Sequence, residues 1–221
     1  MNLIENLTLS QEEQMLQPQG VILRIDRVGS FRLILADQVI LGGPGSSEES
    51  VVKIMAPLSS RHACVRRNKS GYSIEPLRGA VEIKSKLNQK NESRLLLGEA
   101  YFGNNTQAML TPEVGVKLEV VSPLSQSARL TVTPSRRLDQ GWDGLVLMEN
   151  MILLGPGHKM HIVCEHWEQA GALIFRDGLF RFCTPVGLVN LDKDETGQTI
   201  DEPINLNQHY CFDEIGLYLE G

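Results

Sequence analysis

The sequence predicts an all-β protein made of two tandem antiparallel β-sandwiches, preceded by a short N-terminal tail or helix. Three observations support this fold class. Short strand-like segments recur throughout the 221 residues, long helical periodicity is nearly absent, and one pattern of segments occurs twice. A content of 42% hydrophobic and 22% charged residues suits ordinary globular cores. The expected units are a tail over 1–18, one sandwich over 19–122 and a second over 123–221.

The first half contains a series of strand-like segments between turn residues. Residues 31–42 predict two strands joined at Ala36-Asp37-Gln38, and the second strand runs into Gly42-Gly43-Pro44-Gly45. Ahead of them, Ser10-Gln11-Glu12-Glu13 has the spacing of a capping box, which predicts either one short helix or a frayed tail. Further strands are expected at 63–67, 71–74 and 116–120.

The same order of segments returns in the second half. Residues 144–155 again predict two strands, followed here by Pro156-Gly157, and 172–176 and 178–182 repeat the next pair. Separations of about 109 to 113 residues predict an internal duplication, although short strand patterns also match by chance. Ser and Pro cluster at 121–127, which predicts a linker between the halves.

Charge and cysteine usage narrow the classes of function. The net charge of −6 argues against general binding of nucleic acid, which depends on neutralising phosphates. This charge is divided unevenly, with +1 over residues 1–122 and −7 over 123–221. No apolar stretch reaches the roughly 18 residues of a membrane span. Four cysteines without close pairing, Cys64, Cys164, Cys183 and Cys211, favour reduced thiols and a cytoplasmic protein.

One stretch combines groups suited to binding a phosphate. Leu58-Ser59-Ser60-Arg61-His62 is rich in hydroxyls and cations, and it leads directly into the strand at 63–67. Loops gather at the ends of a sandwich, so residues 42–49, 57–61 and 77–79 are expected to share one rim. Hydroxyl donors and a guanidinium are the groups that a phosphate monoester prefers.

The order of these features resembles the forkhead-associated family, a β-sandwich whose loops bind phosphothreonine peptides. The resemblance is carried by the glycine turn at 42–45, by Ser59-Ser60-Arg61-His62 as the family's Ser-x-x-His, and by Gly71-Tyr72. It implies that the Ser59 hydroxyl binds the phosphate and that His62 supports the loop from within.

Two of the family's binding positions differ in this chain. The family pattern has an Arg where Gly43 stands, and an Asn in the region of Ala80. Relocated cations are therefore candidates for the phosphopeptide site beside Ser59 and Ser60, namely Arg61, Arg78 and Lys53. In the second half, Glu168-Gln169-Ala170-Gly171 stands at the place of the motif, which implies a degenerate copy.

Two functions follow from this comparison. The first is a non-catalytic adaptor that docks a phosphothreonine segment of a partner protein on the first module. The alternative is a phosphate-independent scaffold that uses its acidic second half against a basic partner. No cofactor, nucleic-acid or membrane partner is expected.

Metal and catalytic sites are weaker alternatives. His161, Cys164 and His166 lie close together in sequence, but a zinc site needs four ligands and usually a second close pair. Ser59 and His62 are too near in sequence for the usual nucleophile and base. The glycine turn at 42–45 lacks the Lys and the helix of a P-loop. We therefore expect neither a metal site nor an enzyme.

Overall fold

The computed structural model describes residues 20–48, 50–87, 90–104, 106–134, 138, 141–192, 199–212 and 214–221. The fold is all-β, as the sequence predicts, while the expected N-terminal tail or helix at 1–18 lies outside the described residues. The strands are β1 (Val21–Ile25), β2 (Gly29–Ile34), β3 (Gln38–Gly42), β4 (Val51–Lys53), β5 (Ala63–Asn68), β6 (Gly71–Pro76), β7 (Glu82–Leu87), β8 (Lys90–Leu95), β9 (Ala100–Tyr101), β10 (Thr106–Met109), β11 (Gly115–Val120), β12 (Ala128–Thr133), β13 (Gly144–Leu147), β14 (Met151–Gly155), β15 (Ile162–Val163), β16 (Gly171–Arg176), β17 (Leu179–Asn190), β18 (Thr199–Ile204), β19 (His209–Phe212) and β20 (Ile215–Glu220).

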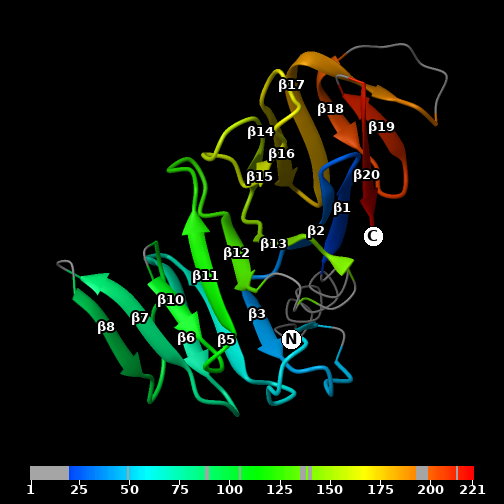
Figure 1. Cartoon of the computed structure of the whole chain (residues 1–221). Coiled ribbons are helices and arrows are strands. Elements are labelled where there is room, and N and C mark those ends of the chain that lie inside the picture. The colour runs from blue at the N-terminus through cyan, green and yellow to red at the C-terminus, as the bar shows by residue number, and fades with distance from the viewer. Residues whose placement is uncertain are drawn as a thin grey trace, which may run out of the picture.

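These strands form one large sheet and one small sheet. The large sheet has the order β15-β14-β16-β17-β19-β20-β1-β2-β13-β12-β11-β10-β7-β8, with β18 paired to β17, and the small sheet has the order β4-β3-β5-β6-β9. Among the described strands, three pairs are parallel, β2 with β13, β3 with β4 and β14 with β15, and the other pairs are antiparallel. Figure 1 shows a lobe on either side of β2 and β13.

Two separate hydrophobic cores lie on opposite faces of the central strands. The first core lies between the small sheet and the β7, β10, β11, β12 and β13 part of the large sheet. The second core lies inside the curve of β14 to β20, where Trp167 packs edge-on against Phe182 and Phe212. Side chains alternate along a strand, so β2 places Ile34 in the first core and Leu33 in the second. The central strands therefore serve both lobes.

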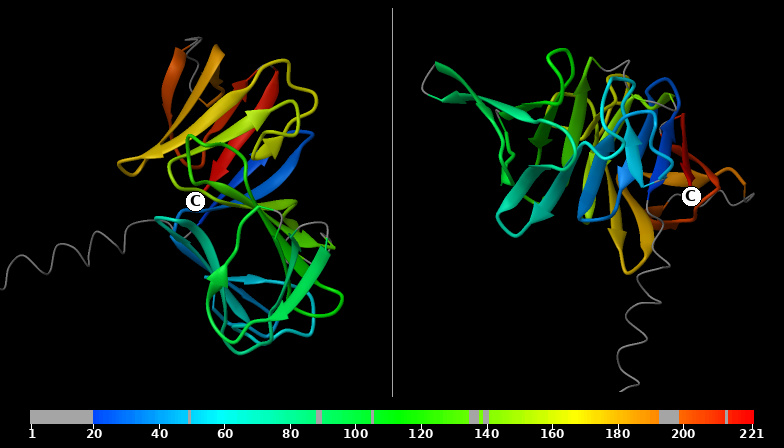
Figure 2. Two further views of the ribbon diagram at one scale, coloured as in Figure 1. Left: turned by 90° about the vertical axis from the view of Figure 1, so that its left-hand side faces the viewer. Right: turned by 90° about the horizontal axis from the view of Figure 1, so that it is seen from below.

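Each lobe is completed by a strand from the other half of the sequence. β1 pairs with β20, the last strand of the chain, and its Val21, Leu23 and Ile25 are buried in the second core. β12 pairs with β11 and places Leu130 and Val132 in the first core. The predicted linker at 121–127 contains no strand, but both cores draw on residues from each side of it. Figure 2 shows the blue β1 among the orange and red strands of the C-terminal lobe.

The repeated sequence pattern corresponds to a repeated order of strands. The pair β3 and β5 is matched by β14 and β16, which are antiparallel neighbours in the same way. In both lobes, the glycine turn leads from the first of these strands to a short parallel neighbour, β4 or β15. The duplication expected from the sequence thus agrees with the pairing of these strands.

Candidate functional site

Three loops meet at one end of the first lobe, and we call this region the rim. The loops are 43–48, 54–62 and 77–81, which follow β3, β4 and β6. Backbone hydrogen bonds connect them: the Gly43 amide donates to the Ser59 carbonyl at 2.9 Å, and the Arg78 amide donates to the Arg61 carbonyl at 3.1 Å. The loops that the sequence assigned to one rim therefore do contact one another.

The glycine turn allows two backbones to approach closely. A Cβ atom on Gly42 would overlap the Ser60 carbonyl, and a Cβ atom on Gly43 would overlap the Leu58 carbonyl. Glycine is favoured where a second backbone comes this near. Position 43 therefore has no room for the arginine of the family pattern while the 54–62 loop keeps this course.

The Ser59 hydroxyl is bonded within the rim. Its Oγ donates to the Arg78 carbonyl at 2.8 Å, which ties the loop after β4 to the loop after β6. Ser60 is half-buried, and its carbonyl is the group that packs against Gly42. Arg78 is exposed. Lys53 is the last residue of β4 and lies opposite Gly42 of β3.

Arg61 is paired with an acidic residue that the sequence analysis did not single out. Its Nη1 lies 2.5 Å from the Glu48 carboxylate, and the two side chains are 38% and 45% exposed. An exposed pair of this kind contributes little to stability, but it places the negative charge of Glu48 beside the guanidinium. Glu48 lies in the 42–49 loop that the sequence places at the rim. Its negative charge on that loop was the available signal for an ion pair with Arg61.

His62 lies inside the rim and is almost fully buried. Its Nε2 donates to the Ala80 carbonyl at 2.9 Å, and its backbone amide donates to the Leu41 carbonyl. Gly79 packs closely against the ring, since a Cβ atom there would overlap the imidazole. Neither Ser59 nor His62 bonds to the other through its side chain, and both donate to carbonyl oxygens instead. This geometry holds the loops together and does not form a nucleophile with its base.

The histidines and cysteine of the second lobe do not converge on a metal. The buried His161 accepts from the Leu153 amide at Nδ1 and faces the Ser127 carbonyl through Nε2, and burial lowers the pKa of its ring. Burial raises the pKa of the Cys164 thiol to about 12. His166 is exposed. Among the residues that the structure describes, no three metal-ligating side chains cluster, and no disulfide joins any of the four cysteines.

Comparison with known proteins finds no similar protein. No protein-family model matches the chain, and no curated protein or solved structure matches it. Within the described residues, no helix has the length and apolar character needed to cross a membrane. The resemblance to the forkhead-associated family therefore rests on the motif residues alone.

Proposed function

We propose that the chain is a non-catalytic protein-interaction scaffold that binds its partner without recognising a phosphate. The observation that carries this proposal is the ion pair between Arg61 and Glu48. A phosphate bound at Arg61 would lie close to the carboxylate of Glu48, and like charges at this distance repel. Arg61, the arginine best placed to replace the one in the family pattern, is thus already paired with a carboxylate.

Two further contacts support binding without phosphate. The approach of Leu58 to Gly43 leaves no space for a guanidinium at the family position. The Ser59 hydroxyl already donates to the Arg78 carbonyl, so its proton is not directed outward to a phosphate oxygen. The exposed apolar side chains Met55 and Leu77 belong to the same loops and suit an apolar contact with a partner.

Selection from two peptide libraries tests this proposal. Immobilised full-length protein is offered a random unphosphorylated library and a matched library with a fixed phosphothreonine. We expect enrichment of a common motif from the unphosphorylated library, and no gain from phosphothreonine. Enrichment that requires phosphothreonine, or the absence of enrichment from either library, would contradict the proposal.

Phosphothreonine recognition by the first lobe is the second candidate. Its support is the backbone bond between Arg78 and Arg61, which keeps two arginines beside Ser59. A phosphate would then have to displace Glu48, whose side chain is 45% exposed. If this candidate holds, Glu48→Gln strengthens binding of a phosphothreonine peptide, and Ser59→Ala and Arg61→Ala weaken it. Glu48→Gln without effect on such a peptide excludes it.

A further inference from the structure

Two hollows adjoin at the junction between the lobes, and together we call them the inter-lobe groove. One is an open hollow of about 320 Å³, lined by Asn104, Lys117, Glu119, Val120, Val121, Arg129, His158 and Lys159. The other is a cavity of about 230 Å³. Arg129 lines both, and the loop between β14 and β15 lines the first through His158 and Lys159 and the second through His161. The two hollows are therefore parts of one surface.

The open hollow is positively charged on an acidic protein. It holds three permanent cations, Lys117, Arg129 and Lys159, and a single carboxylate, Glu119. Glu119 is engaged by Lys117 at 2.5 Å and by Arg129 at 2.6 Å, and these contacts lower the pKa of its carboxyl. Lys159 is exposed and has no ion-pair partner within the described part of the chain. A surplus of positive charge in a hollow attracts an anionic ligand.

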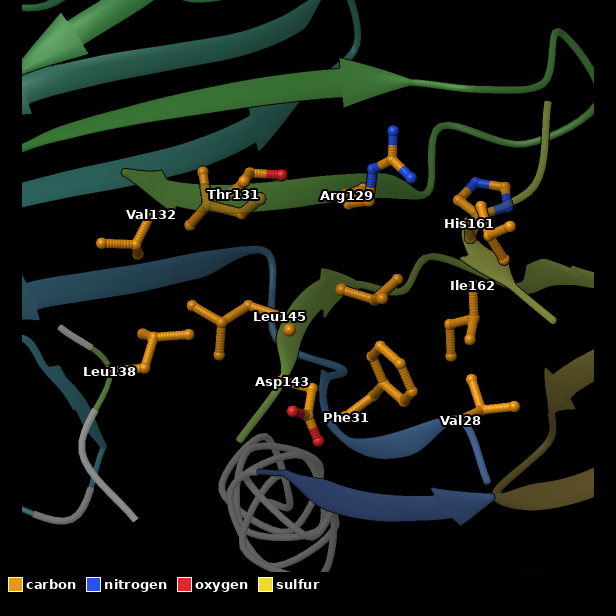
Figure 3. Close-up of a pocket in the computed structure, with 14 residues that line it drawn as sticks. Val28, Phe31, Arg129, Thr131, Val132, Leu138, Asp143, Leu145, His161 and Ile162 are labelled. Carbon is orange, nitrogen blue, oxygen red and sulfur yellow. The ribbon is translucent and has the colours of Figure 1, made fainter. Parts of the chain in front are cut away.

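The cavity beside this hollow is lined mainly by apolar side chains, and the one carboxylate in its lining, that of Asp143, accepts a hydrogen bond from the Ser30 amide. Figure 3 shows Val28 and Phe31 on one side and Thr131 on the other, while Leu138 and Ile162 lie at its two ends. Sites for drug-sized ligands span about 300 to 1,000 Å³, so a cavity of about 230 Å³ suits a single apolar side chain better than a whole ligand. An apolar anchor in a pocket next to charged groups is typical of protein–protein contacts.

We propose that the inter-lobe groove binds an acidic segment of a partner protein, which inserts one apolar side chain into the cavity. This inference rests on the proposed scaffold function and gives it a surface and a partner chemistry. Arg129, whose fork would suit a phosphate, has its Nε and Nη2 engaged by Glu119. Lys159, which has no ion pair among the described residues, and Lys117, which shares Glu119 with Arg129, present compact charges that suit carboxylates spaced along a peptide.

Fluorescence anisotropy with synthetic peptides tests this assignment on the full-length protein at low ionic strength. The first peptide has a central leucine between two runs of three glutamates. A second replaces the leucine by serine, a third replaces the glutamates by lysines, and a fourth carries phosphothreonine in place of the leucine. We expect the first peptide to bind tightest, and the lysine peptide not to bind.

Charge reversal at the groove locates the site. Lys159→Glu is expected to weaken binding of the first peptide by at least about tenfold. Arg176→Glu is the matched control, because Arg176 ends β16 beside the start of β14, whereas Lys159 follows the end of β14. The control is expected to keep wild-type affinity. Both side chains are exposed, so both variants are expected to fold.

A second variant tests the apolar cavity. Thr131 is exposed at the cavity wall, so Thr131→Trp adds bulk there without removing a buried contact. It is expected to reduce binding of the leucine peptide to the level of the serine peptide.

Three results would overturn the groove assignment. The first is no binding of the leucine peptide, and the second is an equal effect of Lys159→Glu and Arg176→Glu. The third is that the phosphothreonine peptide binds more tightly than the leucine peptide and loses this binding in Lys159→Glu. A motif enriched from the unphosphorylated library that ignores Lys159→Glu overturns the groove and leaves the scaffold function standing.

Discussion

At the scale of single residues, the rim of the first lobe depends on glycines that let other groups approach. Gly79 faces the buried ring of His62, and a Cβ atom there would overlap the imidazole. Gly79→Ala is therefore expected to lower the free energy of unfolding by about 1–3 kcal/mol, because the ring or the backbone must shift. Urea unfolding followed by tryptophan fluorescence measures this change.

Gly98→Ala is the matched control for this prediction. A Cβ atom on Gly98 would meet nothing within 4 Å, so the substitution adds no overlap. Its stability is expected to equal or slightly exceed that of the wild type, since alanine restricts the unfolded chain. If both variants lose the same stability, contact with His62 is not the cause.

His161 makes the stability of the protein depend on pH. Burial lowers the pKa of its ring in the folded state, while the unfolded chain keeps a pKa near the ordinary value of about 6.5. The unfolded state thus binds the proton first as pH falls, and the stabilising contribution of neutral His161 is lost. We expect stability to decline below about pH 6.5 toward the folded pKa, by at most about 1.4 kcal/mol per pH unit from this group.

Two histidine variants separate this effect from other titrations. His161→Gln removes the buried titrating group and is expected to flatten the difference in stability between pH 7.5 and 5.5. His166→Gln changes an exposed histidine three positions beyond β15 and is expected to keep the wild-type pH dependence. Urea unfolding at both pH values gives the comparison. A wild-type slope in His161→Gln would show that another group carries the effect.

At the scale of elements, β1 belongs to the lobe built mostly from the second half of the chain. Its Leu23 lies opposite Leu219 of β20 and is buried in the second core. Leu23→Ala is expected to cost about 2–5 kcal/mol, as buried leucines do. Hydrogen exchange is expected to speed up in β20 more than in β11, because β20 is the strand that pairs with β1.

An exposed leucine supplies the control for β1. Leu97 is 96% exposed, so Leu97→Ala is expected to change neither stability nor exchange in β20. Faster exchange in β11 than in β20 after Leu23→Ala would contradict the observed pairing of β1.

The sequence predicts the strands well because their signals are local. Alternation placed β5 and β16 within one residue of their observed bounds, and the glycines at 42 and 155 marked the ends of β3 and β14. The same local signals carry no information on which core a strand enters: β1 alternates in the same way whichever lobe it completes. Pairing between residues almost two hundred positions apart, as in β1 and β20, depends on the whole fold.

The candidate site was also only partly predictable from the sequence. The sequence placed three loops at one rim, since strand order brings loops to the ends of a sandwich. It did not predict that Arg61 bonds to Glu48, because side-chain partners depend on loop geometry. The groove was also missed, since Lys117 and Lys159 lie in different lobes and 42 positions apart.

At the scale of the whole molecule, the exchange of β1 and β12 makes the lobes depend on each other. A fragment of residues 1–122 lacks Leu130 and Val132 in its core, and a fragment of 123–221 lacks Leu23 and Ile25. We expect neither fragment to unfold cooperatively alone, because each lacks a strand that pairs with its last strand. Circular dichroism during thermal unfolding tests each fragment.

Cleavage of the intact protein tests the same dependence without refolding. Leu124 in the 121–127 linker is 78% exposed, so a protease site inserted after Pro123 should be accessible. The cleaved halves are expected to elute together in size-exclusion chromatography and to separate only in denaturant. The reason is that β1 still pairs with β20, and β12 with β11, across the cut. Halves that separate in buffer, or fragments that fold alone, would show that each half is a domain in its own right.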